Sequence, residues 1–422
     1  MKQYSLAIIG GGASGMMAAV TAAGAGCGSV LLLERGGRIG RKLLATGNGR
    51  CNISNRNAGR TGYHGAAPGF VRPAMERFTV EKTLRLFEEM GLPVVEEENG
   101  KLYPYSLQAA AVLDVLRLEL ERLGVEIYTD SEVQTIRRMK DGSFRMQVQS
   151  GEEKTEYAAK RVIVACGGEA SAGLGGCNGG YRLLEGLGHR ITPRLPGIVQ
   201  LKGDMNGLKG LSGSKFEASL TLKDGQKVCR REDGELLFTD YGVSGPPVMQ
   251  LSATASRLLD KGRKPVLEID FLPQIAENAL IGMLHRRAKD RPDKRLEDYF
   301  TGFIPKRLGQ CVLKLSGAAP LSRLSGSLQR QEIETVARLL KCFPVRITGT
   351  NGMKNAQVTI GGADTSQFNP ETMESKLVKG LYVTGELYDI DGDCGGYNLQ
   401  WAWSSGQLAA VEAMRSLAVS QN

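Results

Sequence analysis

The feature that most constrains the fold lies at the start of the chain, where a short apolar run passes directly into a cluster of glycines. Residues 6–9 (LAII) have the length and hydrophobicity of a buried strand, and GGGASG follows without a spacer. In the G-x-G-x-x-G pattern, Gly10 forms the tight turn, Gly12 lets the backbone approach a pyrophosphate, and Gly15 lets the next helix pack closely on the strand. The order of strand, glycines and helix therefore predicts a phosphate-binding turn.

The residues that follow extend this turn into a nucleotide-binding unit. Met16 to Ala25 are small or helix-forming, so the free N–H groups and positive dipole end of a helix would face the phosphates. The next strand, predicted at 29–33, ends in Glu34. This carboxylate lies about 20 residues beyond the glycines, where an acidic side chain holds a ribose hydroxyl. Residues 1–34 thus predict a dinucleotide site.

Length and composition set limits on the rest of the chain. A chain of 422 residues exceeds one ordinary core and predicts two or three domains. Its composition, 41% hydrophobic and 23% charged, is that of a soluble globular protein. No apolar run approaches the roughly 18 residues that a membrane helix needs, and the N-terminus lacks the order of a signal peptide. We expect a cytoplasmic protein without a membrane partner.

The cysteine, histidine and charge patterns bear on metals and nucleic acids. The eight cysteines include no C-x-x-C pair, and the three histidines (64, 189 and 285) lie far apart, so we expect no metal site. A cytosolic compartment would keep the cysteines as thiols. The formal net charge of +9 could steer anionic partners. The densest basic cluster, residues 285–291, lacks interleaved aromatic residues, so a solvated helix face is favoured and a nucleic-acid partner is not expected.

Two loops are candidates for contact with the dinucleotide. The first, residues 46–55 (TGNGRCNISN), is rich in glycine and asparagine and poor in apolar residues. Its many donors and flexible backbone suit wrapping around a planar polar ring, although an ordinary surface turn would have a similar composition. We favour contact with the ligand, because this loop closely follows the nucleotide half-site.

The second loop (residues 387–397) follows Gly385-Glu386 and is rich in glycine and aspartate. Glu386 could accept hydrogen bonds from ribityl hydroxyls. The N–H groups of Gly396–Leu399, at the start of a predicted helix, could face the N1–C2 edge of an isoalloxazine ring, where negative charge develops on reduction. Calcium binding by the three aspartates is the alternative, but the loop lacks the twelfth-position Glu of an EF-hand. This second cradle favours a flavin.

Periodicity and turn residues predict the other elements. Apolar residues recur at helical spacing over 79–90 and 106–123, and Asn99-Gly100 between them indicates a hairpin. Strands are predicted at 125–128, 132–139, 144–148, 156–159, 161–165 and 379–384, and further helices near 247–260, 273–289, 305–314, 330–341 and 398–414. The strand at 161–165 ends in Cys166-Gly167-Gly168, as expected where a chain crosses back over a cofactor.

Changes in composition predict a domain inserted between two parts of the nucleotide domain. The first part would span residues 1–190 and the second 345–422, where the apolar and glycine-rich pattern returns. The insert, residues 191–344, would contain a β-barrel (191–245 and around 325–344) and a helical region (246–324). The predicted fold class is α/β, with a Rossmann-like domain built from both chain ends and an inserted β-barrel plus helical domain.

Seven blocks of the sequence are distinctive: TGNGRCNISN (46–55), ENGKLYPYS (98–106), CGG (166–168), GELLFTDYGVSGP (234–246), AQVTIGGA (356–363), TMESK (372–376) and GELYDIDGDCGGYNLQWAWSSGQLA (385–409). In these blocks the chain resembles the BaiN/aminoacetone-oxidase-like family of FAD-dependent oxidoreductases, within the glutathione-reductase-like flavoproteins. The resemblance implies an FAD-binding domain formed by both chain ends. One departure is Asn178-Gly179-Gly180-Tyr181, where the family usually has Gly-Asp-Gly-Tyr, so this chain lacks that carboxylate.

The resemblance also implies which residues contact FAD. The glycines at the chain start and Glu34 would bind the adenosine half, Arg41, Lys42 and the 46–52 loop would follow the pyrophosphate and ring, and the last loop would surround the ribityl chain and flavin. The full expected set is Gly10, Gly12, Ala13, Ser14, Gly15, Glu34, Arg35, Arg41, Lys42, Thr46, Gly47, Asn48, Gly49, Arg50, Cys51, Asn52, Val133, Ala165, Cys166, Gly167, Gly168, Gly385, Glu386, Asp393, Gly395, Gly396, Tyr397, Asn398 and Leu399.

The resemblance points to two-electron redox chemistry on a small molecule. Some members are proposed as NAD(P)H-linked reducers of conjugated enones in steroid-like bile acid intermediates, and others as oxidases of small amino ketones such as aminoacetone. The chain has no second G-x-G-x-x-G with a downstream acid, so NAD(P)H would dock transiently over the flavin. A flavin-dependent tRNA-modifying protein and a flavin-binding protein without turnover are alternatives of other classes. The charge of +9 keeps the first of these open.

Enone reduction needs a proton donor besides the hydride. Four tyrosines are candidates: Tyr103, Tyr105, Tyr241 and Tyr397. The motif places Tyr397 closest to the ring, so it is the expected catalytic residue, although a packing role is the alternative for each tyrosine. Cys51 and Cys394 flank the expected ring, but without C-x-x-C or C-x4-C spacing buried thiols are favoured over a redox disulfide. Trp401 and Trp403 are expected in the core.

Overall fold

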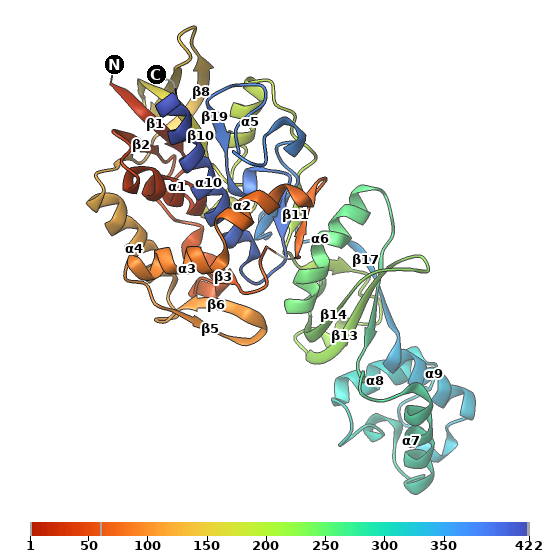
Figure 1. Cartoon of the computed structure of the whole chain (residues 1–422). Coiled ribbons are helices and arrows are strands. Elements are labelled where there is room, and N and C mark those ends of the chain that lie inside the picture. The colour runs from red at the N-terminus through yellow and green to blue at the C-terminus, as the bar shows by residue number, and fades with distance from the viewer. Residues whose placement is uncertain (1, 60, 420–422) are drawn as a thin grey trace. The chain divides into compact units, whose positions relative to one another are not determined.

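The computed structural model describes residues 2–59 and 61–419 (Figure 1). It divides the chain into two compact units, one formed by Met1–Leu195 with Gln357–Asn422 and the other by Pro196–Ala356. The sequence predicted an insert of this kind, with limits at residues 191 and 344. The red start and the blue end of the ribbon in Figure 1 both belong to the first unit.

The first unit is built on a seven-stranded sheet with the order β7-β2-β1-β10-β9-β8, and β19 also pairs with β10. The strands are β1 (Gln3–Ile9), β2 (Val30–Leu33), β7 (Glu126–Tyr128), β8 (Glu132–Arg138), β9 (Phe144–Ser150), β10 (Glu153–Val164) and β19 (Leu381–Val383). β1 pairs in parallel with β2 and β10, as do β7 with β2 and β19 with β10. Every residue of β2 is buried, as in a strand covered on both faces.

β10 is a single strand where the sequence predicted two, at 156–159 and 161–165, and that division is wrong. The backbone continues through Lys160, whose side chain is exposed, and Arg161, which donates to Ser416 Oγ at 2.7 Å. Neither charge is buried unpaired, so neither interrupts the strand. The first half of β10 pairs antiparallel with β9, and the second half pairs parallel with β1 and β19.

The helices of the first unit are α1 (Ala13–Gly24), α2 (Arg72–Arg77), α3 (Val80–Glu89), α4 (Ala109–Arg122), α5 (Gly179–Gly186) and α10 (Tyr397–Val419). α1 and α10 pack directly on each other, because a Cβ at Gly406 would lie only 2.5 Å from the carbonyl oxygen of Ser14. Thr384 Oγ1 also donates to Ser14 Oγ at 3.1 Å. One domain therefore contains both chain ends, and the predicted Rossmann-like fold class is confirmed.

Two small sheets join distant parts of the first unit. One contains β3 (Ser54–Asn55), β6 (Lys101–Pro104) and β5 (Val94–Glu96), and the other pairs β4 (Tyr63–His64) with β20 (Asp391–Gly392). The hairpin between β5 and β6 turns with positive φ at Asn99 and Gly100, as that pair of residues predicted. None of the helices that the structure describes is long and apolar enough to cross a membrane.

The second unit combines a closed barrel, in the order β12-β15-β14-β13-β16-β17, with four helices. The strands are β12 (Leu201–Gly203), β13 (Lys215–Asp224), β14 (Lys227–Phe238), β15 (Gly242–Ser244), β16 (Val266–Asp270) and β17 (Phe343–Thr350), and the helices are α6 (Pro246–Asp260), α7 (Glu277–Asp290), α8 (Lys306–Leu315) and α9 (Arg330–Lys341).

The four helices match the predicted helical patterns, but two barrel segments differ from the prediction. The stretch around 325–344 is mostly α9, whose buried residues recur at helical spacing. Conversely, β16 lies in the region expected to be helical, and its five residues alternate in burial.

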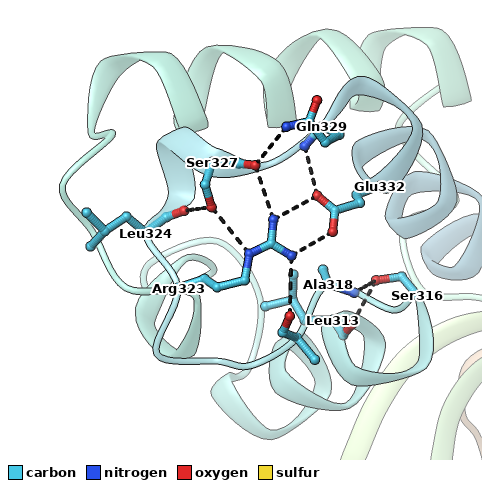
Figure 2. Close-up of polar contacts among 9 residues, drawn as sticks. Leu313, Ser316, Ala318, Arg323, Leu324, Ser327, Gln329 and Glu332 are labelled. Atoms are coloured by element: carbon cyan, nitrogen blue, oxygen red, sulfur yellow. Dashed lines mark hydrogen bonds and ion pairs between the residues drawn. The ribbon is translucent and has the colours of Figure 1, made fainter.

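A polar cluster fixes the segment that leads into α9 (Figure 2). The guanidinium of Arg323 binds both carboxylate oxygens of Glu332, at 2.7 and 3.1 Å. The same carboxylate accepts the backbone N–H of Gln329 at 2.8 Å, which caps the N-terminus of the helix. The Arg323 guanidinium also donates to the backbone carbonyl of Ser327. One carboxylate therefore holds both the helix start and the chain before it.

Replacing Glu332 with alanine should lower the free energy of unfolding of the second unit by about 1–3 kcal/mol, because charge-assisted hydrogen bonds are lost and the guanidinium keeps no carboxylate. The Arg323 guanidinium lowers the pKa of Glu332, so this stabilisation exists above the pKa of an unfolded glutamate and disappears as pH falls. Urea unfolding followed by far-UV circular dichroism, at pH 7 and pH 3, measures both effects. Glu334→Ala on the same helix is the control, since its partner Arg330 is 84% exposed.

Candidate functional site

The three glycines of the first turn have different surroundings. A Cβ at Gly10 would lie 2.5 Å from the carbonyl oxygen of Ala165, and one at Gly15 would lie 1.9 Å from the carbonyl oxygen of Gly10. At Gly12 no described atom lies within 4 Å of a Cβ, and φ is −80°. Gly10 and Gly15 are thus required by packing within the protein. Gly12 is not, and the open space beside it fits a ligand that approaches the backbone.

The start of α1 presents backbone donors toward this open space. Gly12 is the N-cap residue, no side chain caps the helix, and its first turn contains no acidic residue. The first bond along the helix runs from the Met16 N–H to the Gly12 carbonyl, so Ala13 and Ser14 have backbone N–H groups without intrahelical acceptors. A pyrophosphate fits this set of donors and the positive end of the helix dipole.

Glu34 is held beside the same turn. Its carboxylate accepts the N–H of Gly11 at 2.8 Å and the N–H of Gly36 at 2.6 Å. The Glu34 carbonyl accepts the N–H of Ser131 at 2.9 Å, which brings the start of β8, with buried Val133, to this end of the sheet. The remaining lone pairs of the carboxylate can accept ribose hydroxyls.

A second cluster joins residues from four separate segments. Lys42 Nζ lies 2.8 Å from one carboxylate oxygen of Glu386 and 3.1 Å from the other. The Glu386 carboxylate also accepts the N–H of Thr359 at 2.8 Å. A Cβ at Gly168 would lie 2.3 Å from Thr359 Oγ1 and 2.5 Å from the Glu386 carboxylate. The predicted residues Lys42, Gly168 and Glu386 therefore meet, together with Thr359, which was not among the expected site residues although it lies in one of the distinctive blocks.

The two glycine-rich loops contact each other. Asn55 Nδ2 donates to the carbonyl of Gly395 at 2.9 Å, and a Cβ at Gly396 would lie 2.3 Å from the carbonyl oxygen of Ser54. Asn52 Oδ1 accepts the N–H of Leu102 from β6 at 3.3 Å. The loops predicted to surround the flavin ring are thus brought together from opposite ends of the chain.

Buried side chains of α10 hold these loops in place. Ser54 Oγ donates to Gln400 Oε1 at 2.6 Å, and Trp403 Nε1 donates to the carbonyl of Ile53 at 2.9 Å. Trp401 Nε1 donates to the carbonyl of Gly385, also at 2.9 Å. Trp401 and Trp403 are 1% and 0% exposed, so their prediction as core residues is confirmed. Their indole N–H groups also fix the backbone of the site.

Side chains of α10 and β4 hold the loop before α10. Asn398 receives the N–H of Gly392 on Oδ1 and donates to the carbonyl of the same residue, both at 2.8 Å. His64 Nε2 lies 2.9 Å from Asp393 Oδ1. Tyr63 donates its hydroxyl to the backbone carbonyl of Tyr397 at 2.9 Å. His64 was not among the predicted site residues, since a single histidine in an unpatterned stretch gives no local signal.

A family model described as "HI0933-like protein Rossmann domain" matches residues 4–412. The chain belongs to this family. A 3-dehydro-bile acid delta(4,6)-reductase of Clostridium scindens is 38% identical over 97% of this chain and 98% of its own length. A ribosomal RNA dihydrouridine synthase of Haemophilus influenzae is 31% identical over 98% of this chain and 100% of its own length.

Solved structures share the fold of this HI0933-like chain. A 3-ketosteroid delta1-dehydrogenase from Sterolibacterium denitrificans aligns over 99% of this chain and 100% of its own length, with a TM-score of 0.50 and 12% identity. A quinol-fumarate reductase aligns over 100% of this chain and 73% of its own, with a TM-score of 0.50 and 16% identity. The resemblance inferred from the sequence blocks is confirmed, and the protein is an FAD-dependent oxidoreductase.

Several residues expected to contact FAD make other contacts in this HI0933-like structure. Arg35 donates to the carbonyl of Gly175 at 3.2 Å, and Arg41 is exposed. Thr46 donates its hydroxyl to the carbonyl of Leu43 at 2.6 Å. Within the 46–52 loop, Gly47, Asn48, Gly49 and Cys51 all have positive φ. These observations leave the roles of those residues as predictions.

The four tyrosine candidates lie in different surroundings, and Arg50 contacts one of them. Arg50 pairs with Glu97 and lies over the ring of Tyr103, with 4.3 Å between guanidinium carbon and ring centroid. Tyr105 is 73% exposed, and Tyr241 belongs to the second unit. Tyr397 packs edge-on against Tyr63, with ring centroids 5.8 Å apart. Tyr397 is the first residue of α10, directly after the loop that the motif assigns to the ring, and its role as proton donor stays a prediction.

The cysteines of the site are thiols. All eight cysteines lie among the described residues, and none of them forms a disulfide bond. Burial raises the pKa of Cys51 to about 12 and raises the pKa of Cys394 as well, so neither is a thiolate near neutral pH. Cys166 donates to the carbonyl of Ile9 at 3.4 Å. This favours the prediction of buried thiols over a redox disulfide.

Proposed function

We propose that the enzyme uses NAD(P)H to reduce a carbon–carbon double bond conjugated with a carbonyl group, in a 3-oxo steroid or bile-acid-like molecule. The observation that carries the proposal is the 38% identity with a 3-dehydro-bile acid delta(4,6)-reductase over 97% of the chain. The match includes both segments that converge at the site, the 46–55 loop and the loop before α10.

The bond that is reduced is better supported than the molecule that contains it. A delta(4,6) double-bond system beside a 3-oxo group is a conjugated ketone. The uracil ring of uridine likewise has a double bond conjugated with a carbonyl, and dihydrouridine is the product of its reduction. Both relatives are thus named for the reduction of the same functional group. This shared chemistry supports two-electron reduction as the reaction.

The residues of the site fit the binding of FAD, which supplies hydride transfer when bound. The N–H groups at the start of α1 would bind the pyrophosphate, and Glu34 would hold the ribose. Lys42 and Glu386 would lie along the middle of the cofactor. The N–H groups at the start of α10 would polarise the ring edge where negative charge develops.

An RNA substrate is the second candidate, and the distribution of charge favours it. Residues 196–356 contain 26 Lys and Arg against 17 Asp and Glu, whereas the rest of the chain contains 28 of each. The second unit therefore accounts for the whole net charge of +9. Within its described residues, several exposed cations form no ion pair: Lys209, Arg286, Lys289, Arg307 and Lys314. Such a unit suits a polyanion.

Anaerobic reduction of the FAD enzyme by NADH or NADPH, followed by reoxidation with different acceptors, tests the proposal. We expect fast reoxidation by a 3-oxo-Δ4,6 steroid. Reoxidation by ribosomal RNA instead, with an affinity that falls steeply with salt, would favour the second candidate. Reoxidation by oxygen alone, with aminoacetone as the electron donor, would point to an amino ketone oxidase. Failure of both nicotinamides to reduce the flavin would contradict the reductase proposal.

A further inference from the structure

We propose that His64 is the proton donor of the reduction and that Asp393 positions its imidazole ring. The inference rests on the proposed function, and it applies equally to a steroid enone and to a uracil ring. His64 is the last residue of β4, and β4 pairs antiparallel with β20, which lies in the loop before α10. That pairing places the only histidine among the described site residues against the loop assigned to the flavin ring.

The geometry defines which nitrogen can donate. Nε2 lies 2.9 Å from Asp393 Oδ1, which fixes the plane of the ring. Among the described residues, no hydrogen bond involves Nδ1. Asp393 is itself held, because its backbone N–H donates to the carbonyl of Gly62 at 2.8 Å and its carbonyl accepts from Asn398 at 3.4 Å. Nδ1 is therefore the nitrogen left to face a substrate.

The neighbouring hydroxyl groups are less suited to this role. Tyr63 already donates to the Tyr397 carbonyl, and burial raises its pKa well above the usual value. Burial, with the charge of Asp393, also raises the pKa of Tyr397. The His64 side chain is 36% exposed, so it can regain a proton from water after each turnover. Histidine is also the side chain that gives up and regains a proton most readily near neutral pH.

The surroundings of His64 are acidic. Asp391 lies opposite His64 in the β4–β20 ladder, and Asp389 Oδ2 accepts the N–H of Ala66 at 3.4 Å. With Asp393 they place three carboxylates of one loop along this strand. Among the described residues of these elements, Tyr63, Tyr388, Cys394 and Tyr397 are also titratable, and Lys101 of β6 brings a positive charge to the same loop. The sequence left calcium binding by these aspartates as an alternative, whereas the structure joins Asp393 to a histidine.

The proposed step balances in atoms and charge. FAD, when bound and reduced, would supply the hydride for a new C–H bond at the β carbon of the conjugated system, and the carbon–carbon π bond would break. The π electrons move to the α carbon and carbonyl oxygen as an enolate. Nδ1–H of the imidazolium then gives its proton to the α carbon, and the neutral imidazole regains a proton from water. NAD(P)H would supply the two electrons used in each turnover.

His64→Gln tests the assignment when the two half-reactions are measured separately. We expect the same FAD content and absorption spectrum as in the wild type, and an unchanged rate of flavin reduction by NAD(P)H. Reoxidation by a 3-oxo-Δ4,6 steroid, or by a uridine-containing ribosomal RNA fragment, should slow by about 100- to 10,000-fold. Reoxidation by ferricyanide, which needs no proton donor, should not change. In His64→Ala, added imidazole should restore part of the lost rate.

Two further variants test whether the loss of reoxidation is specific to His64. His285→Gln, in the second unit, is the matched control and should behave as the wild type. Tyr397→Phe tests the tyrosine predicted from the sequence. The assignment is overturned if His64→Gln is reoxidised by the conjugated ketone at the wild-type rate, or if ferricyanide reoxidation slows equally, since the latter indicates a structural role. If the wild type itself is reoxidised by neither substrate, the proposed function fails, and the role of His64 fails with it.

Discussion

Gly12→Val should weaken FAD binding by about 10- to 100-fold, which corresponds to the roughly 1–3 kcal/mol typical of an overpacked contact. The reason is that the protein itself leaves the space beside Gly12 open, with no described atom within 4 Å of a Cβ. The backbone at Gly12 has φ −80° and ψ −172°, which valine adopts without strain. The side chain would therefore occupy the space that we assign to the cofactor. Fluorescence titration of apoprotein with FAD measures the affinity.

The stability of the apoprotein distinguishes this effect from misfolding. Gly12→Val apoprotein should unfold at the same urea concentration as the wild type, whereas Gly15→Ala should be strongly destabilised, because its Cβ would lie 1.9 Å from the carbonyl oxygen of Gly10. Gly282→Val is the matched control, since it lies in α7 of the second unit with open space around it. Unchanged FAD affinity in Gly12→Val would contradict the placement of the pyrophosphate at this turn.

The parts of the fold that were predictable are those specified by local pattern. The apolar run of β1, the glycine turn and the helix after it lie within one short stretch, so their spacing alone identifies them. Pairing between strands is specified by contacts across the chain instead. This is why β10 was divided in two and why β16, five residues between helices, was assigned to a helical region. A strand as short as β16 also gives too little periodicity to be distinguished from the helices around it.

The same contrast between local sequence pattern and tertiary contact applies to the residues of the site. Glu34 follows the glycines at a spacing set by one strand and one helix, so sequence alone placed it. His64 and Thr359 were missed, because their partners are determined by tertiary structure. Asp393 lies 329 residues from His64, and Glu386 lies 27 residues from Thr359. Side chains of this kind become candidates only when the tertiary structure is known.

Trp403→Ala should lower the free energy of unfolding of the first unit by about 3–5 kcal/mol, the usual cost of removing a buried aromatic side chain. Trp403 is 0% exposed and packs edge-on against Phe87, with ring centroids 5.3 Å apart. Its Nε1–H also satisfies the carbonyl of Ile53, which precedes β3. Loss of the indole therefore leaves a cavity and an unpaired carbonyl at the 46–55 loop. Urea unfolding, followed by the fluorescence of the remaining Trp401, measures the change.

The consequence for the site follows from the same contact. Because Trp403 connects α10 to the 46–55 loop, Trp403→Ala should also increase the rate of FAD dissociation. Trp403→Phe keeps most of the packing but has no N–H donor. Its free energy of unfolding should fall by only about 1–3 kcal/mol. Tyr105→Ala, at a residue 73% exposed in the same unit, should change stability by no more than about 0.5 kcal/mol. If Trp403→Ala were as mild as Tyr105→Ala, the last helix would not hold the loop, and convergence of the two chain ends could not be what shapes the flavin site.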